Sequence, residues 1–327
     1  MTTCFQTTFI AASLLLLASS CSSRSEVETE ENAPDIAFVT EVDQIHVSLK
    51  GKRFTTYHFG EKWPKPFLHP VFSLDGRDVT RGWPVVPREG ESDDHIWHRG
   101  LFMGHDQING VDFWREKEPE QTARLVPRVA PRTDQTTGTL QVELDLLTPK
   151  RESIGAFKQK FTFSASGKNA VIDVEATIVA DRDQKLELGD TEEGFVGFRF
   201  HDAFTEKNGA WITNSSGLSG SENIWGKRAL WVDYSTILDN AKIGVAMFDH
   251  PSNPRHPTFW HARGYGLCGI NAFGIRNFTG DETRDGTMTI PKDGELKFRY
   301  HFVIHPGDAT ESEVVQLHKD YYEKSKL

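Results

Sequence analysis

One short segment, Asp93 to Asp106, has a high density of side chains that can transfer protons. It contains three of the chain's 13 histidines, three aspartates and an arginine, beside Trp97 and Phe102. Imidazoles next to aromatic rings are typical of a small-molecule site, whereas a loop that needs only solubility uses Lys, Glu and Ser. General acid/base chemistry needs imidazoles that titrate near the operating pH, and His95 and His98 are the candidates for proton transfer.

The spacing within this segment limits which side chains can act together. If residues 97–105 form a strand, Arg99 and His105 share one face but lie roughly 20 Å apart, too far for joint action on one bond. His95 and His98 are three residues apart, which brings two imidazoles together in a helical turn but not in a strand. Either the strand bends at its glycines, or only part of this group acts.

Three interpretations of the segment compete. Aspartates beside the histidines can fix the tautomer of an imidazole, as both acid/base and metal-binding histidines require. A metal site would use Asp94, His95 and His98, although no HExxH or comparable spacing occurs. In the structural interpretation the same side chains only tie loops together. We favour acid/base chemistry, with no metal and no other cofactor.

A second polar segment, residues 249–263, has a proline at every third position of its first half. The prolines at 251, 254 and 257 repeat with the period of a polyproline II helix, which sets the side chains between them along one stiff ridge. Donors and acceptors beside Trp260 suit sugar recognition, because an aromatic face stacks on the ring while polar groups bind hydroxyls. The alternative is a rigid crossover whose polar groups bind its own backbone. The predicted sugar-binding wall consists of Asn253, His256 and Trp260, and His261 and Arg263 are further predicted substrate contacts.

Two further segments supply a carboxylate, a cation and aromatic rings. Glu193 precedes a glycine and an apolar run, where it can serve as the paired carboxylate at the mouth of a sandwich, although adjacent acids are usually a solvated turn. Arg199 is the natural anchor for an anionic group. Residues 225–234 have the aromatic density of a groove, although aromatic strands more often belong to a core. The remaining predicted substrate contacts are Arg99, His105, Arg199 and Asp233.

Charge and missing motifs disfavour several classes of function. The 327 residues carry a net charge of −10 and no basic stripe, which argues against a nucleic-acid partner. No P-loop, dinucleotide-binding glycine motif, Gly-x-Ser-x-Gly elbow or cysteine pair occurs. Phosphoryl transfer, nicotinamide chemistry and serine hydrolysis are therefore disfavoured.

The N-terminal residues predict an export signal. An apolar run that is too short to span a bilayer leads into Leu17-Ala18-Ser19-Ser20-Cys21, which resembles the lipobox of bacterial lipoproteins. We expect residues 1–21 to be a lipoprotein signal peptide, Cys21 to be lipidated, and residues 22–35 to be a disordered tether. Membrane contact would then occur only through the N-terminal lipid. The expected location is the bacterial cell envelope, in the periplasm or at the outer membrane.

Alternating apolar positions predict a β-rich domain around these segments. The clearest period-two runs cover residues 45–49, 140–146, 157–163, 172–178, 195–200, 242–248 and 296–304. Prolines at 64, 66 and 70 argue against a regular ladder there. A capping box at Thr310 to Glu313, followed by apolar residues at helical spacing, predicts a terminal helix. We therefore predict an all-β fold in which residues 36–327 form one large antiparallel β-sandwich domain with one C-terminal helix.

Four motifs, spread over most of the mature chain, carry a family resemblance. They are Asp94-His95-x-x-His98-Arg99 with Asn109-Gly110-x-Asp112-Phe113-Trp114, Thr191-x-Glu193-Gly194 with Arg199, Trp231-Val232-Asp233-Tyr234, and Phe248-Asp249-His250-Pro251-x-Asn253-Pro254 through Trp260-His261-x-Arg263-x-Tyr265-Gly266. The sequence thereby resembles the DUF6807 family of secreted bacterial proteins, also labelled methane oxygenase PmoA. The family usually has another histidine where this chain has Trp97, which weakens a metal site. The resemblance implies a galactose-mutarotase-like supersandwich, in which histidines and a carboxylate do acid/base work on sugars.

Residues and resemblance together lead to one hypothesis and two alternatives. We expect a carbohydrate-active enzyme of the envelope, a hydrolase, lyase or epimerase, in which His95, His98 and Glu193 act on a sugar, a glycan or another small polar substrate. A non-catalytic glycan-binding lipoprotein would use the same wall and leave His95 far from Glu193. A metal-dependent oxygenase, as the family label suggests, would need three ligands that converge on one point. A particulate methane monooxygenase subunit would also need several apolar spans of about 20 residues, and none follows residue 21.

Overall fold

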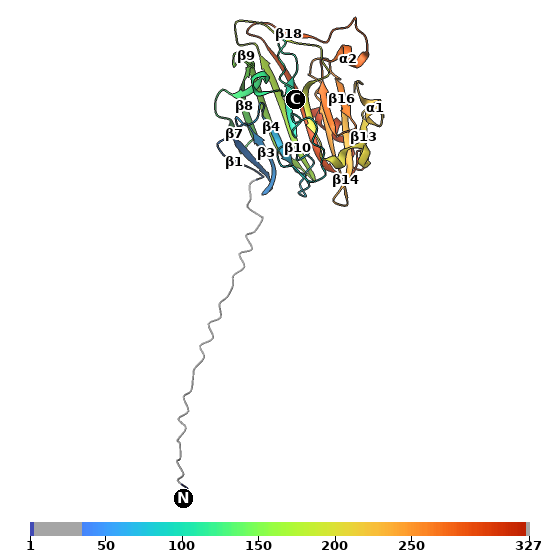
Figure 1. The fold of residues 1–327 in the computed structure, drawn as a ribbon. Coiled ribbons are helices and arrows are strands. Elements are labelled where there is room, and N and C mark those ends of the chain that lie inside the picture. The colour runs from blue at the N-terminus through green and yellow to red at the C-terminus, as the bar shows by residue number, and fades with distance from the viewer. Residues whose placement is uncertain (3–34, 325–327) are drawn as a thin grey trace. The chain divides into compact units, whose positions relative to one another are not determined.

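Two antiparallel sheets pack face to face around an apolar core (Figure 1). The computed structural model describes residues 1–2 and 35–324, and residues 35–324 belong to one compact unit. The predicted signal peptide, the lipidated Cys21 and nearly all of the predicted tether lie outside the described residues. The all-β class, the large antiparallel sandwich and the C-terminal helix are confirmed.

The first sheet has eight strands and brings together segments that are far apart in the sequence. β12 lies between β5 and β17, and it pairs with both in antiparallel register. In sheet order the strands are β1 (Ile36–Thr40), β2 (Gln44–Leu49), β3 (Lys52–His58), β4 (Phe67–Val71), β5 (Leu101–His105), β12 (Gly194–Arg199), β17 (Leu267–Asn271) and β16 (Phe259–Arg263).

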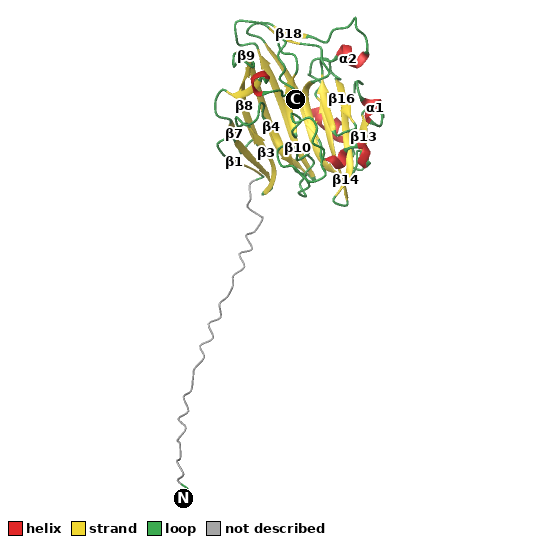
Figure 2. Cartoon of the chain, in the orientation of Figure 1, coloured by secondary structure: helices red, strands yellow, loops and turns green. Residues whose placement is uncertain are grey.

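The second sheet has nine strands, and strands dominate the described chain (Figure 2). Its strands are β13 (Trp211–Asn214), β14 (Trp231–Leu238), β15 (Ala241–Asp249), β19 (Glu295–Pro306), β10 (Asn169–Val179), β9 (Ser153–Ser166), β8 (Thr139–Leu147) and β6 (Arg124–Pro127), with β7 (Arg132–Asp134) paired to β8. The other elements are the strand pair β11 (Leu186–Leu188) and β18 (Met288–Ile290), the helices α1 (Ser221–Ile224), α2 (Ile275–Thr279) and α3 (Val314–Lys324), and the 3-10 turns η2 (Pro119–Gln121), η3 (Asp202–Phe204) and η4 (Glu206–Asn208). No helix among the described residues is both long and apolar enough to cross a membrane.

Aromatic rings from both sheets meet in the core between them. Phe54 on β3 packs edge-on against Phe163 on β9, with ring centroids 6.0 Å apart. Phe195 on β12 packs against Phe298 on β19, with centroids 4.8 Å apart. Because successive side chains of a strand point to opposite faces, the alternate positions of the first sheet face away from this core. Those outward positions are where a site can be built.

One local expectation was wrong. The helix α3 begins at Val314 and not within the predicted capping box, because Glu313 has a φ of 52° and cannot belong to a right-handed helix. The strand β4 runs through Pro70, and its ladder is not regular there, as the prolines predicted. The register of β3 against β4 shifts between Thr55 and Tyr57, opposite this proline, so the missing N–H falls at an irregularity of the ladder.

Candidate active site

A row of glycines opens the outward face of the first sheet around β12. Gly197 on β12 pairs with Gly269 on β17, and Gly269 in turn pairs with His261 on β16. A Cβ atom on Gly197 would lie 2.5 Å from the Phe102 ring, so only glycine lets that ring cover the strand. Phe102 and Trp114 belong to an apolar cluster separate from the core between the sheets. The glycines therefore leave room for rings that other segments supply.

His95 and His98 lie face to face, and the ring of His98 stacks on that of Phe102. Four rings form a stack in which centroids are 5.4 Å apart for Phe102 and His98, 4.9 Å for His98 and His95, and 5.5 Å for His95 and Tyr265. The backbone turns between the histidines, and the N–H of His98 donates to the carbonyl of His95 at 2.9 Å. The expected strand over residues 97–105 begins only at Leu101. The three-residue spacing of His95 and His98 brings their rings together because the backbone turns between them.

The imidazole of His98 is buried without a hydrogen bond to either ring nitrogen within residues 35–324. Burial, together with the charge of Arg199, lowers the pKa of His98 well below 6.5, so the ring is neutral at neutral pH. A neutral imidazole carries one donor and one acceptor, and buried polar groups that lack partners are rare in native proteins. His98 therefore stands out as a group whose hydrogen-bonding capacity is not used by the fold.

Asp94 orients the ring of His95. The Nδ1 atom of His95 lies 3.3 Å from Oδ1 of Asp94, as expected for an aspartate that fixes a tautomer. The same oxygen accepts from Nη2 of Arg199 at 2.8 Å and from Arg81. Although burial opposes the effect, these two guanidiniums lower the pKa of the Asp94 carboxyl, which is therefore ionised. His95 has a side chain that is 39% exposed, so it can reach a ligand.

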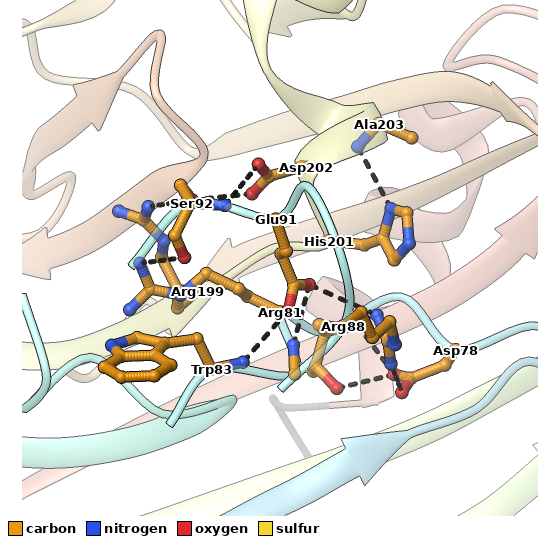
Figure 3. A network of polar contacts seen from close by, with 12 residues as sticks. Asp78, Arg81, Trp83, Arg88, Glu91, Ser92, Arg199, His201, Asp202 and Ala203 are labelled. Atoms are coloured by element: carbon orange, nitrogen blue, oxygen red, sulfur yellow. Dashed lines mark hydrogen bonds and ion pairs between the residues drawn. The ribbon is translucent and has the colours of Figure 1, made fainter. Parts of the chain in front are cut away.

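A polar network holds the loop before Asp94 against β12 (Figure 3). Arg199 donates to Oγ of Ser92 at 3.1 Å, while the backbone N–H and Oγ of Ser92 donate to Asp202 at 2.8 and 2.7 Å. Glu91 accepts two backbone N–H groups of the same loop, at 2.8 and 3.0 Å. The buried Arg199 thus positions Asp94, and its Nε and Nη1 atoms have no partner within residues 35–324.

Glu193 lies immediately before β12, where it pairs with a cation. Oε1 of Glu193 lies 3.2 Å from Nη2 of Arg115, and Nη1 of Arg115 lies 2.9 Å from Asp106. Burial raises the pKa of the Glu193 carboxyl against the opposing charge of Arg115, and the neighbouring Glu192 and Asp106 add to the rise. A carboxyl with a raised pKa holds its proton closer to neutral pH and can act as a general acid.

Tyr265 connects these groups and was not among the residues predicted for the site. Its ring stacks on His95, and the guanidinium carbons of Arg199 and Arg263 lie 4.8 and 5.5 Å from its centroid. Burial raises the pKa of the Tyr265 phenol to about 12, with Arg263 and Arg199 opposing and Glu193 adding to the rise. The motif from Trp260 to Gly266 contained the signal that could have identified this tyrosine.

Only the last residues of the proline-rich segment reach this face. Nδ1 of His261 lies 3.6 Å from a carboxylate oxygen of Glu192, and burial lowers the pKa of His261 to about 3. The ring of Trp225 lies 6.4 Å from that of His261. Trp225, Arg263 and Tyr265 line a groove of about 430 Å³, and of these three residues Tyr265 is the one that stacks on His95.

The predicted sugar-binding wall lies elsewhere. The buried Asp249 accepts from Nδ2 of Asn253 at 2.8 Å and lies 2.8 Å from Nδ1 of His256, so both side chains serve their own loop. Trp260 is fully buried, and its Nε1 donates to the carbonyl of Ala229 at 2.9 Å. The segment thus has the organisation of a rigid crossover, and Asn253, His256 and Trp260 are not brought to the histidines.

Asp233 and His105 are not brought to this face either. Asp233, on β14 of the second sheet, is buried against Nε2 of His305 at 2.7 Å. His105 points into the core, where its ring packs 4.5 Å from that of Phe273 and its Nε2 lies 3.0 Å from the carbonyl of Gly189. Burial lowers the pKa of His105 to about 3.

Arg99 lies two residues before β5 and is a buried cation that pairs within the fold. Its Nη1 donates to Glu116 at 2.7 Å, and Nζ of Lys65 lies 3.1 Å from the same carboxylate. The Arg99 guanidinium also lies 4.5 Å from the ring of Trp63. Sequence reasoning missed Glu116 and Lys65, because no local sequence pattern identifies a partner of Arg99 that comes from another segment.

The described residues contain no group of three or more His, Cys, Asp or Glu side chains arranged to hold a metal ion. His95 and His98 stack with only 11° between their planes, so their nitrogen lone pairs do not converge on one point. Asp94 already accepts from two arginines. The geometry therefore gives no support to a metal site on these three residues.

Buried neutral histidines predict a loss of stability in acid. The pKa values of His69, His105 and His261 are lowered to about 3 by burial, against about 6.5 in an unfolded chain. Between these values the unfolded state binds more protons, so each histidine removes about 1.4 kcal/mol of stability per pH unit as the pH falls below 6.5. Urea unfolding at several pH values measures this slope.

The His105→Gln variant isolates one histidine in this prediction. It cannot gain a proton in the unfolded state, so its unfolding free energy should fall less steeply with decreasing pH than that of the wild type. The half-buried His46, with a side chain that is 30% exposed, supplies the control substitution His46→Gln. Identical slopes for wild type and His105→Gln would contradict the assignment of a buried neutral imidazole.

A family model matches residues 44–319, which is most of the chain. The chain belongs to that family, DUF6807, which is described as a family of unknown function. A search of curated proteins finds no match to the sequence.

Solved structures with a similar fold have low sequence identity to this chain. A galactose mutarotase related enzyme from Lactobacillus acidophilus has 8% identity and a TM-score of 0.38, with 83% of this chain and 97% of that chain covered. A galactose mutarotase-like protein from Clostridium acetobutylicum has 10% identity and a TM-score of 0.40, with 84% and 99% covered. An alpha-galactosidase from Geobacillus stearothermophilus, in complex with 1-deoxygalactonojirimycin, has 13% identity and a TM-score of 0.38, with 84% and 40% covered. At these values we take neither an activity nor a ligand from them.

Proposed function

We propose that this DUF6807 protein is a carbohydrate-active enzyme that performs general acid/base chemistry on the outward face of its first sheet. One observation carries the proposal: the exposed imidazole of His95 is oriented by Asp94 and stacks on the ring of Tyr265. Glu193, immediately before β12, supplies a carboxyl of raised pKa. Acid/base catalysis requires one group that accepts a proton and a second that donates one. His95 is the proposed base, and Glu193 is the proposed acid.

The surroundings of this pair suit a sugar. The rings of Tyr265 and Trp225 line the groove and can stack on the apolar face of a pyranose. Within residues 35–324 the ring nitrogens of Trp225 and His98 have no hydrogen-bond partner, and we propose that hydroxyl groups of the sugar supply one. Hydrolases, lyases and epimerases of sugars all use an acid and a base in this way, so the pair is compatible with each of the three.

We also propose that the enzyme acts in the bacterial cell envelope, attached by a lipid at Cys21. The support is the lipobox-like sequence before Cys21 and the polar residues that follow it. The lipid would keep the β-sandwich near a membrane without any spanning segment.

The test is turnover of a glycan panel by the purified full chain, with His95→Ala as the first variant. Products are followed by reducing-end release, by absorbance of unsaturated sugars and by NMR for epimers. We expect His95→Ala to lower kcat by about 10²–10⁴-fold on any glycan that the wild type converts, because the base is lost. His46→Ala, which changes a histidine on β2 near Glu41, is the matched control and should retain full activity.

Two outcomes would count against the proposal. Full activity of His95→Ala would remove this histidine from the mechanism. Tight binding of a glycan without any turnover would favour the alternative of a non-catalytic glycan-binding lipoprotein, in which Tyr265 and Trp225 matter and His95 does not.

A further inference from the structure

Arg263 is a cation on the candidate site without a carboxylate partner. No ion pair of Arg263 with an acidic side chain occurs within residues 35–324, and its described contact is the ring of Tyr265 at 5.5 Å. The other arginines of the face all have carboxylates: Arg199 pairs with Asp94, and Arg115 pairs with Glu193. The fold therefore uses their charges and leaves that of Arg263 available.

A second cation beside the same ring has unused donors. The side chain of Arg199 is 0% exposed, its guanidinium carbon lies 4.8 Å from the Tyr265 centroid, and its Nε and Nη1 atoms lack partners. Its one carboxylate, Asp94, is shared with Arg81. Arg81 and Arg199 thus share one carboxylate, while Arg263 has no ion pair within residues 35–324. Buried donors without partners are rare unless a ligand or solvent uses them.

The opposite end of the face carries surplus negative charge. Arg115 is the cation that pairs with Glu193, Asp106 and Asp112, at 3.2, 2.9 and 3.5 Å. Glu192 lies beside them and faces His261. An anionic group of a ligand is therefore repelled from the end that holds Glu193.

The groove next to Arg263 has the size and the lining for a sugar unit. Its volume is about 430 Å³, within the range of small-molecule sites, and it is lined by Trp225, Tyr265 and Arg263. Glu222 also lines it, at an exposed position where solvent screens its charge. A guanidinium fork binds a planar carboxylate through two parallel hydrogen bonds, while an aromatic ring stacks on the sugar.

We propose that the substrate contains a uronic acid unit, and that Arg263 binds the carboxylate of this unit. This inference rests on the proposed function, because it names the substrate class of the same site. With the carboxylate held at Arg263, the sugar ring lies beside Tyr265 and extends toward His95 and Glu193. The charge separation across the face sets this direction of binding.

Calorimetry with two pairs of probes tests the inference on the full chain. Oligogalacturonides and oligomannuronates are compared with galacto- and manno-oligosaccharides of the same length, which differ from them by the carboxylate. We expect wild-type protein to bind one of the uronates at least about 10-fold more tightly than its neutral counterpart, as a charged hydrogen-bonded pair provides. Arg263→Ala should lose this preference, and Arg263→Lys should restore only part of it, because an ammonium cannot bind both oxygens in the same plane.

Arg284→Ala, which removes an exposed arginine from a loop, is the matched control and should keep the wild-type preference. Equal affinity for uronates and neutral sugars would overturn the inference, as would a preference that survives in Arg263→Ala. Tighter binding of a sulfated galactan fragment than of any uronate would assign Arg263 to a sulfate ester and would also overturn it.

The same measurements separate this inference from the proposed function. Binding of a uronate that depends on Arg263, in a protein that converts no glycan, would support the inference and contradict the enzyme. Turnover of neutral glycans that depends on His95, without any preference for uronates, would support the enzyme and contradict the inference.

Discussion

Glu193→Gln is expected to lower kcat by about 10²–10⁴-fold on a glycan that the wild type converts, with little change in KM. Glutamine has the shape of glutamate but cannot transfer a proton. The fold should persist, because Arg115 keeps its contacts with Asp106 and Asp112. Loss of rate with retained binding is the signature of a group that acts in the transition state.

The pH profile makes this prediction specific for an acid. Burial raises the pKa of the Glu193 carboxyl above 4.5, so the protonated, active form persists to higher pH than for an exposed glutamate. The wild-type rate should therefore fall as the pH rises through this pKa, and Glu193→Gln should lack that limb of the profile. A steady-state pH series on both proteins measures it.

Glu192→Gln is the matched control for Glu193→Gln. Glu192 is the adjacent carboxylate, with a side chain that is 34% exposed and lies 3.6 Å from Nδ1 of His261. Its replacement should change kcat by no more than a few-fold. If Glu193→Gln had wild-type kcat and an unchanged pH profile, Glu193 would not be the acid.

Glu116→Ala is expected to lower the free energy of unfolding by about 3–5 kcal/mol. The carboxylate of Glu116 pairs with Arg99 and Lys65, and the side chains of both cations are only 3% exposed. Its removal leaves two positive charges buried without compensation. Although burial opposes the effect, Lys65 and Arg99 lower the pKa of Glu116, so the ionised carboxylate stabilises the fold at neutral pH and protonation in acid removes this contribution.

Urea unfolding at neutral pH measures this loss. Glu118→Ala changes an exposed glutamate two residues away and should leave stability within about 0.5 kcal/mol of the wild type. A triple variant with Met at positions 65 and 99 and Leu at 116 should recover much of the loss, because apolar groups of similar size remove the uncompensated charge. A loss below about 1 kcal/mol in Glu116→Ala would show that the three charges do not form a buried unit.

The β-sandwich was largely predictable from alternation. The run at residues 172–178 lies within β10, and the run at 296–304 lies within β19. This prediction succeeds because the pleat places alternate residues on opposite faces, so the apolar pattern of a strand directly reports which face meets a core. The helix start failed at Glu313, because its positive φ comes from a tight turn and not from the residue types of a capping box.

The candidate site was predictable only in part. The pairing of His95 with His98 followed from their three-residue spacing, and Glu193 was selected from a local motif. Their grouping with Tyr265 depends on β5, β12 and β17 being neighbours, which no local pattern contains. The same limit explains why Asn253 and His256 were wrongly assigned to the site. The spacing of the prolines does not show that Asp249 is the hydrogen-bond partner of both side chains.

The segment Asp93 to Asp106 illustrates what the sequence determined and what the tertiary structure determined. The sequence by itself established that this segment is rich in imidazoles, that His95 and His98 need a turn to meet, and that strands surround it. The tertiary structure decided that Arg99 is paired with Glu116, that His105 faces the core and that the ring of His95 stacks on Tyr265. The physical reason is that burial follows from local periodicity, whereas the partner of a polar side chain depends on strand order and register across the sheet.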